Sequence, residues 1–84
     1  MNLNKQNLIN KIKYRSQYRG TKEMDIYVSD FVDNIINDLD YSELEHLNKL
    51  INLNDEQIIE ISKGNFNLDI NEKIINLLIN YKKK

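Results

Sequence analysis

The sequence has no cysteine, no proline and no tryptophan, and only two of its 84 residues are glycine. Without cysteine the chain can form no disulfide, and it has neither a thiol nucleophile nor a zinc-thiolate site, so a reducing compartment suits it best. No apolar run is longer than the three residues Leu77-Leu78-Ile79. Such a run is too short for a transmembrane helix or for the apolar part of a secretory signal peptide. We expect a soluble protein without membrane insertion.

Residues that usually carry catalysis or bind metals are also scarce. His46 is the only histidine, and it stands in no DxH, HxxxH or HxxE spacing. Asp30 and Asp33 could share a cation, but a solvated helix face explains them more simply. Gly20 and Gly64 are isolated, so there is no glycine-rich phosphate loop and no Rossmann-type crevice for FAD. We therefore predict no catalytic residue, no metal site and no stably bound cofactor, and we interpret His46 as an ordinary surface or boundary residue.

Charge is distributed unevenly along the chain, although the net charge is only −1. Residues 1–22 contain six basic residues and no acidic residue, whereas residues 23–72 contain all 13 acidic residues. Residues 73–84 are basic again. A bipolar surface of this kind favours an oriented protein partner, because the acidic middle would repel a polyanion such as nucleic acid.

Two tyrosines in the basic segment support an alternative function. Tyr14 and Tyr18 interleave with basic residues such as Arg15, a pattern suited to stacking on bases while contacting phosphates. The alternative is therefore a small helical nucleic-acid-binding or regulatory module. The structural interpretation is that one tyrosine packs on the second helix while the other covers an arginine stem.

Apolar residues recur at spacings of three and four almost throughout the chain, which predicts an all-α fold. We expect one domain over residues 1–84, a small bundle of five helices. The first two predicted helices cover roughly residues 4–18 and 21–39. The third opens at Ser42, the fourth starts at Asn54-Asp55 and stops at Gly64, and the last opens at Asp69 and ends before the lysine tail. Their expected starts include Gly20 as N-cap with Glu23, and the capping-box patterns Ser42 to Glu45 and Asp69 to Glu72. Gly64 is expected as a left-handed C-cap. The predicted core residues are Leu8, Ile9, Ile12, Met24, Tyr27, Val28, Phe31, Ile35, Leu39, Leu44, Leu47, Leu50, Ile51, Ile58, Ile59, Ile61, Ile70, Ile74, Leu77, Leu78 and Tyr81.

The link between the first two predicted helices is the best candidate for a functional site. Gly20 has no Cβ, so another backbone or a partner surface can come close to it. Arg19 offers a planar fork of donors, and Glu23 and Asp25 add carboxylates one turn later. This combination suits docking on a partner better than bond-making. In the purely structural alternative, Arg19 pairs with Glu23, Gly20 only breaks the helix, and Asp25 is solvated.

The same residues carry a family resemblance. The run Arg15-Ser16-Gln17-Tyr18-Arg19-Gly20-Thr21-Lys22-Glu23-Met24-Asp25 resembles the RSxxRGxxExD signature of the SdhE-type FAD assembly factors, which assist flavinylation of succinate dehydrogenase. The resemblance covers roughly residues 8–62, and length and helix count agree. The chain departs from the family pattern at Ile61, where tryptophan is frequent, and at Asn48, where glutamate is frequent.

The resemblance implies a function as well as a fold. Family members are small five-helix proteins that bind the flavoprotein subunit of succinate dehydrogenase, and in some cases of fumarate reductase, and promote covalent attachment of FAD. The resemblance implies that the docking surface contains Arg19, Gly20, Glu23 and Asp25, with Arg15 beside them. FAD would belong to the client flavoprotein. We expect a monomeric cytoplasmic assembly factor, located in the mitochondrial matrix if its source is eukaryotic, that binds no nucleic acid.

Overall fold

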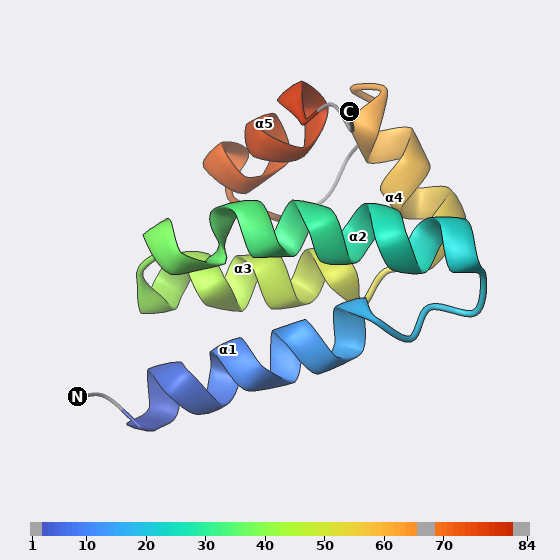
Figure 1. Cartoon of the computed structure of the whole chain (residues 1–84). Coiled ribbons are helices and arrows are strands. Elements are labelled where there is room, and N and C mark those ends of the chain that lie inside the picture. The colour runs from blue at the N-terminus through green and yellow to red at the C-terminus, as the bar shows by residue number, and fades with distance from the viewer. Residues whose placement is uncertain (1–2, 66–68, 82–84) are drawn as a thin grey trace.

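The computed structural model describes residues 3–65 and 69–81, and these ranges form α-helices without any strand (Figure 1). The predicted all-α fold with five helices is confirmed. The lysine tail, residues 82–84, and most of the predicted loop 65–68 lie outside the described residues. The elements are α1 (Leu3–Ser16), α2 (Lys22–Ile35), a 3-10 turn η1 (Ile36–Asp38), α3 (Tyr41–Ile51), α4 (Asp55–Ser62) and α5 (Glu72–Asn80).

The first two helices are shorter than predicted at the link between them. α1 ends at Ser16 rather than at Tyr18, and α2 is capped by Thr21 rather than by Gly20. The Thr21 hydroxyl accepts a hydrogen bond from the Met24 N–H, at 3.3 Å. Glycine has no side chain with which to cap, so the neighbouring threonine takes this position. Residues 17–21 therefore form an open link, called here the α1–α2 corner.

α3 begins two residues earlier than predicted. Asp40 is the N-cap in place of Ser42, and it forms a complete capping box with Glu43. The Asp40 carboxylate accepts from the Glu43 N–H at 2.8 Å, and the Glu43 carboxylate accepts from the Asp40 N–H at 2.9 Å. Leu39, directly before the cap, is buried in the core. The chain leaves the core at Leu39, so the helix can begin at the first capping residue that follows it.

The start of α4 agrees with the prediction, whereas that of α5 does not. Asn54 caps α4 in a capping box with Gln57. α5 is capped by Asn71 instead of Asp69, and the Asn71 side chain accepts from the Lys73 N–H at 2.7 Å. The chain before α5 is held at Asn71, because its backbone N–H donates to His46 Nδ1 on α3 at 3.0 Å.

Gly64 ends α4 as predicted. Its φ of +88° lies in the left-handed region that glycine occupies readily. The N–H of Gly64 donates to the Ile61 carbonyl, and the N–H of Asn65 donates to the Glu60 carbonyl, both at 2.9 Å. This pair of bonds is a Schellman motif, which satisfies carbonyls left open at the end of a helix.

The core follows the predicted apolar faces with a few differences. Ile59 was predicted to be buried but is 39% exposed, because the two-turn α4 buries only the face of Ile58 and Ile61. Val32, Ile36 and Ile75 are buried although they were not predicted. For Ile36 the reason is the tighter 3-10 turn, which departs from the 3.6-residue period assumed for a continuous helix. The buried apolar residues are Ile12, Val28, Phe31, Val32, Ile36, Leu39, Leu44, Leu47, Leu50, Ile51, Ile58, Ile61, Ile74, Ile75 and Leu78, with Leu8, Ile9, Met24, Tyr27, Ile35, Ile70, Leu77 and Tyr81 partly buried against them.

The helices are arranged around α2 and α3. α1 packs against these two helices and lies at one edge of the bundle, while α4 and α5 pack together on the other side (Figure 1). An aromatic cluster joins α2 to the end of α5, with the Tyr81 ring 5.9 Å from that of Tyr27 and 5.5 Å from that of Phe31. This arrangement brings the α1–α2 link and the α3–α4 link to the same end of the molecule (Figure 1). In the described ranges no helix combines the length and hydrophobicity needed to cross a membrane.

Candidate functional site

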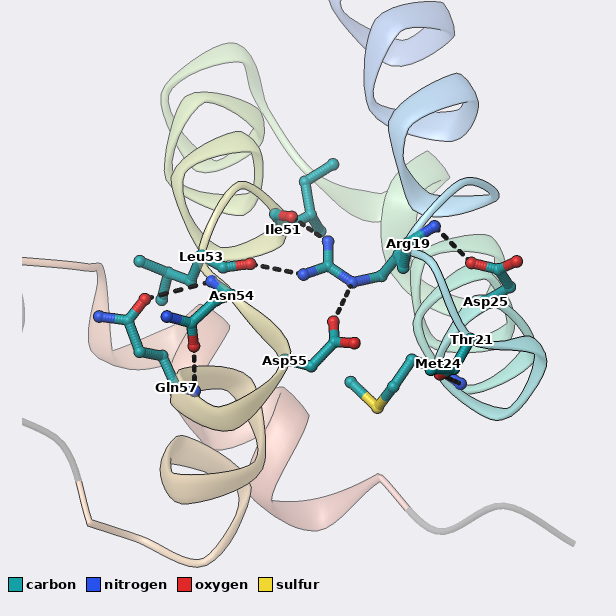
Figure 2. Close-up of polar contacts among 9 residues, drawn as sticks. All are labelled: Arg19, Thr21, Met24, Asp25, Ile51, Leu53, Asn54, Asp55 and Gln57. Carbon is teal, nitrogen blue, oxygen red and sulfur yellow. Dashed lines mark hydrogen bonds and ion pairs between the residues drawn. The ribbon is translucent and has the colours of Figure 1, made fainter.

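Arg19 connects the α1–α2 corner to residues 51–55, called here the α3–α4 corner (Figure 2). Its Nε lies 3.0 Å from Oδ1 of Asp55, the first residue of α4. Its two terminal nitrogens donate to the backbone carbonyls of Ile51 and Leu53. The last carbonyls of an α-helix have no partner within the helix, so a guanidinium fork at the end of α3 satisfies acceptors that would otherwise be open.

Burial shows that this contact lies inside the fold. Only 5% of the Arg19 side chain is exposed, against 29% of the Asp55 side chain. A buried charge is tolerated where it is paired and hydrogen-bonded, as it is here. The guanidinium therefore fixes the positions of two chain corners relative to each other.

Asp25 holds the same corner from the other side. Its Oδ1 accepts a hydrogen bond from the backbone N–H of Arg19, across the turn that contains Gly20 (Figure 2). Asp25 lies in the first turn of α2, where the helix dipole also favours a carboxylate. The backbone of Arg19 is thus tied to α2 while its side chain is tied to α3 and α4.

Gly20 is exposed at the tip of this braced turn. Its φ is +108°, a conformation that other residues rarely adopt. A Cβ built on Gly20 would meet no atom within 4 Å. The glycine therefore satisfies a backbone requirement, while the space in front of it is open to another molecule.

The five predicted site residues divide into two groups. Arg15, Gly20 and Glu23 are exposed. Asp25 is half-buried, and the implied surface position is wrong for the Arg19 side chain, which is buried because it provides partners for the end of α3. Within the described residues, the side chains of Arg15 and Glu23 have no hydrogen bond or ion pair.

The structural alternative for this motif is also corrected in detail. Arg19 pairs with Asp55 rather than with Glu23, and Asp25 is engaged by the Arg19 backbone rather than simply solvated. Sequence reasoning missed Asp55, Ile51 and Leu53 as partners of Arg19. The available signal was weak: Asn54-Asp55 marked a helix start, but nothing in its spacing pointed to a residue 36 positions earlier.

The prediction that one of the two tyrosines packs on the second helix is wrong. Neither Tyr14 nor Tyr18 packs into the bundle, since their exposed fractions are 69% and 61%. The two rings instead pack against each other, with centroids 4.8 Å apart and planes inclined by 44°. They form an aromatic pair between the last turn of α1 and the α1–α2 corner.

His46 has a structural role that the sequence did not indicate. It is half-buried, and its Nδ1 accepts the Asn71 N–H before α5. Nearby, Lys73 Nζ lies 2.8 Å from the Glu43 carboxylate. The Lys73 hydrogen bond, followed by that of the Asp40 N–H, lowers the pKa of Glu43, and the Glu43 hydrogen bond raises the pKa of Lys73. These contacts attach α5 to α3, away from the α1–α2 corner.

The described residues contain no group of three histidine or acidic side chains that could hold a metal ion. Burial raises the pKa of the Tyr27 and Tyr81 hydroxyls, but both belong to the aromatic cluster at α5. The features that distinguish the α1–α2 corner are a braced turn, an open glycine and an unpaired carboxylate. They suit recognition of another macromolecule.

Comparison with known proteins identifies the family of the chain. The family of flavinators of succinate dehydrogenase (Sdh5) matches the chain over residues 10–81. Because the match spans most of the chain, the protein belongs to this family, whose members are assembly factors for succinate dehydrogenase flavinylation rather than enzymes. The searches of curated proteins and of solved structures found no significant match.

Proposed function

We propose that this protein binds the flavoprotein subunit of succinate dehydrogenase through the α1–α2 corner and promotes covalent attachment of FAD to it. We propose the fumarate reductase flavoprotein as a second client, bound and flavinylated in the same way. Binding would favour a client conformation in which the isoalloxazine and the acceptor histidine are already aligned, which lowers the entropic part of the barrier. The bond-forming chemistry and the FAD belong to the client.

The geometry of Gly20 is the observation that carries this proposal. Its turn is held on both sides, by Asp25 on the Arg19 backbone and by Asp55 on the Arg19 side chain, yet its own front face is open. A rigid, open turn lets a partner backbone approach without an ordering cost in the assembly factor. Exposed Glu23 and Arg15 then supply charged groups beside it.

The five site residues take two different roles in this proposal. Gly20, Glu23 and Arg15 contact the client, whereas Arg19 and Asp25 position them. A charge-assisted hydrogen bond accepted by Glu23 or donated by Arg15 that becomes buried on binding would be worth about 2 kcal/mol or more. Arg19 and Asp25 would contribute by keeping the turn in the binding conformation.

Gly20→Arg tests the proposal, with Gly64→Arg as its matched control. Both glycines have positive φ and open space at Cβ, so both substitutions carry a similar backbone cost of about 1–2 kcal/mol. Only Gly20→Arg places a long side chain at the proposed docking surface. In a strain lacking the native factor, we expect Gly20→Arg to abolish covalent flavin on the succinate dehydrogenase subunit, read by in-gel fluorescence, and Gly64→Arg to support it.

Thermal melts of both variants separate docking from folding. The proposal predicts similar melting temperatures for the two variants and a difference in flavinylation alone. Normal flavinylation with Gly20→Arg would contradict it. Equal loss of flavinylation by Gly20→Arg and Gly64→Arg would contradict it as well, since stability and not position would then explain the effect.

A further inference from the structure

We infer that the outer face of α1 binds an acidic surface of the same flavoprotein client, which also covers the exposed tyrosine pair. This α1 outer face consists of Lys11, Tyr14, Arg15 and Tyr18. The inference rests on the proposed function and extends it: the corner supplies close approach, and the α1 outer face determines which part of the client lies against the helix.

The spacing of these residues places them on one side of the helix. Positions 11, 14 and 15 recur at spacings of three and four residues, so they follow one stripe of α1. Tyr18 follows the end of the helix and joins this stripe through its ring contact with Tyr14. The opposite stripe contains Ile12 and Ser16, which are buried against the bundle. α1 packs on α2 and α3 with that buried side. Among the described helices, none covers the outward side of α1 at the edge of the molecule (Figure 1).

Tyr14 and Tyr18 form a pair of large aromatic side chains that is exposed to solvent. Each ring is more than half exposed, and its ring contact is with the other tyrosine. Tyrosine offers a large apolar surface at a low entropic cost, which is why it is enriched in protein interfaces. The tilted ring contact at 4.8 Å brings the two rings together before a partner arrives, which lowers the ordering cost of binding. A single exposed aromatic such as Tyr41 lacks this second ring.

Charge identifies the chemistry of the occupant. The first 22 residues have no acidic group, and none of the ion pairs in the described chain uses Lys11, Arg15 or Lys22. These cations are therefore available to a partner. Every acidic residue of the chain lies after Lys22. An acidic partner surface would be attracted to α1 and repelled by the acidic residues 23–72, which fixes its orientation.

A protein surface fits these observations better than a nucleic acid. An extended polyanion would also come close to the acidic residues 23–72 and be repelled by them, whereas a compact acidic patch would contact α1 alone. The α1 outer face is also continuous with the proposed docking corner, since Tyr18 stands two residues before Gly20. One client surface can therefore cover both.

The test measures binding of the full chain to the purified apo flavoprotein subunit. The double variant Tyr14→Ser/Tyr18→Ser removes both rings, and Lys11→Glu/Arg15→Glu reverses the charge of two exposed, unpaired side chains. Tyr41→Ser is the matched control, because it removes an exposed tyrosine from the start of α3. We expect Kd to rise about tenfold or more for each double variant and to change less than about twofold for Tyr41→Ser. The charge-reversed variant should also bind less tightly as salt is lowered, opposite to the wild type.

The outcomes distinguish this inference from the proposed function. If the wild-type chain does not bind the flavoprotein, the proposed function fails and this inference fails with it. If the wild type binds and Gly20→Arg does not, while both double variants bind like the wild type, only this inference is overturned. Should the tyrosine variant fail to fold, the charge-reversed variant decides alone. Tight binding of a single-stranded oligonucleotide that is lost in both double variants, without any change in flavoprotein binding, would also overturn the inference in favour of a nucleic-acid surface.

Discussion

The guanidinium of Arg19 and the carboxylate of Asp55 form an ion pair at 3.0 Å between residues 36 positions apart in the chain. The pair joins the link before α2 to the first turn of α4. The second arginine of the family signature, Arg19, is therefore part of the protein's internal structure. A substitution of Arg19 tests the stability of the fold as well as binding to a client.

Arg19→Ala should destabilise the fold. The change leaves the carbonyls of Ile51 and Leu53 without their donors and leaves Asp55 unpaired, so we expect a loss of about 2–4 kcal/mol in the free energy of unfolding. Urea denaturation measures it. Arg19→Lys should recover little of the lost stability, because an ammonium group cannot reach all three acceptors of the guanidinium. Flavinylation should fall together with stability.

Asp55→Asn is the control for Arg19→Ala. It removes the charge while keeping an oxygen that can accept the Nε hydrogen bond, and Asp55 is partly exposed, so we expect a smaller loss of about 1 kcal/mol. In the double variant the two losses should be less than additive. An Arg19→Ala variant as stable as the wild type would show that the fork contributes nothing to stability.

Glu23→Ala should weaken client binding without affecting the fold. Glu23 is exposed and unpaired at the second position of α2, so its removal should change stability by less than about 0.5 kcal/mol. Its loss from the docking surface should raise Kd for the apo flavoprotein by about tenfold or more. Isothermal titration calorimetry measures the change.

Glu56→Ala is the position-matched control for Glu23→Ala. Glu56 is also exposed, and it is the second residue of α4, so it meets the helix dipole in the same way. We expect binding by Glu56→Ala to equal that of the wild type. If the two substitutions weakened binding equally, the cause would be the change in net charge of the protein and not the position of Glu23 at the α1–α2 corner.

His46→Ala should loosen α5 without affecting client docking. The sequence indicated an ordinary surface or boundary residue, but the structure shows that the Asn71 N–H would lose its acceptor, at an expected cost of about 1 kcal/mol. Hydrogen exchange should become faster in residues 71–80, and flavinylation should remain normal at permissive temperature. Unchanged exchange in α5 would show that His46 Nδ1 does not hold this helix.

The Glu43–Lys73 ion pair should make stability depend on pH at the two extremes. The Lys73 hydrogen bond lowers the pKa of Glu43 from 4.5, so the stabilisation is present above that value and is lost as pH falls through the lowered pKa. The pKa of Lys73 is raised from 10.5, so its contribution is present below that value and is lost as pH rises through the raised pKa. As pH falls from neutral through the lowered pKa of Glu43, Glu43→Gln should therefore lose less stability than the wild type. Parallel pH profiles of the two proteins would contradict this prediction.

Free FAD should bind weakly or not at all. The only two glycines of the chain are isolated, so no glycine-rich phosphate loop is present. Equilibrium dialysis of the purified chain against FAD measures the affinity. Tight stoichiometric binding would make the protein a flavin carrier and would require a different mechanism from docking alone.

The sequence predicted the helices well because helical periodicity is a local property. The recurrence of apolar residues at three and four positions gave five helices and most of the core, and the capping residues Asn54 and Gly64 gave the limits of α4. Errors occurred where two neighbouring residues could both cap, as at Asp40 and Ser42, and where the 3-10 turn at Ile36 departed from the helical period.

The candidate site was only half predictable, since its residues act through contacts that no local pattern encodes. The order Arg19, Gly20, Glu23, Asp25 and its charge types were determined by the sequence itself, as was the need for a glycine at the turn. The direction of the Arg19 side chain was decided by the packing of α1 against α3, which brings the unpaired carbonyls at the end of α3 within reach of its guanidinium. A planar donor fork near open carbonyls and a carboxylate is buried there rather than offered to a partner. The tertiary structure therefore assigned Arg19 to the interior and left Gly20 and Glu23 at the surface.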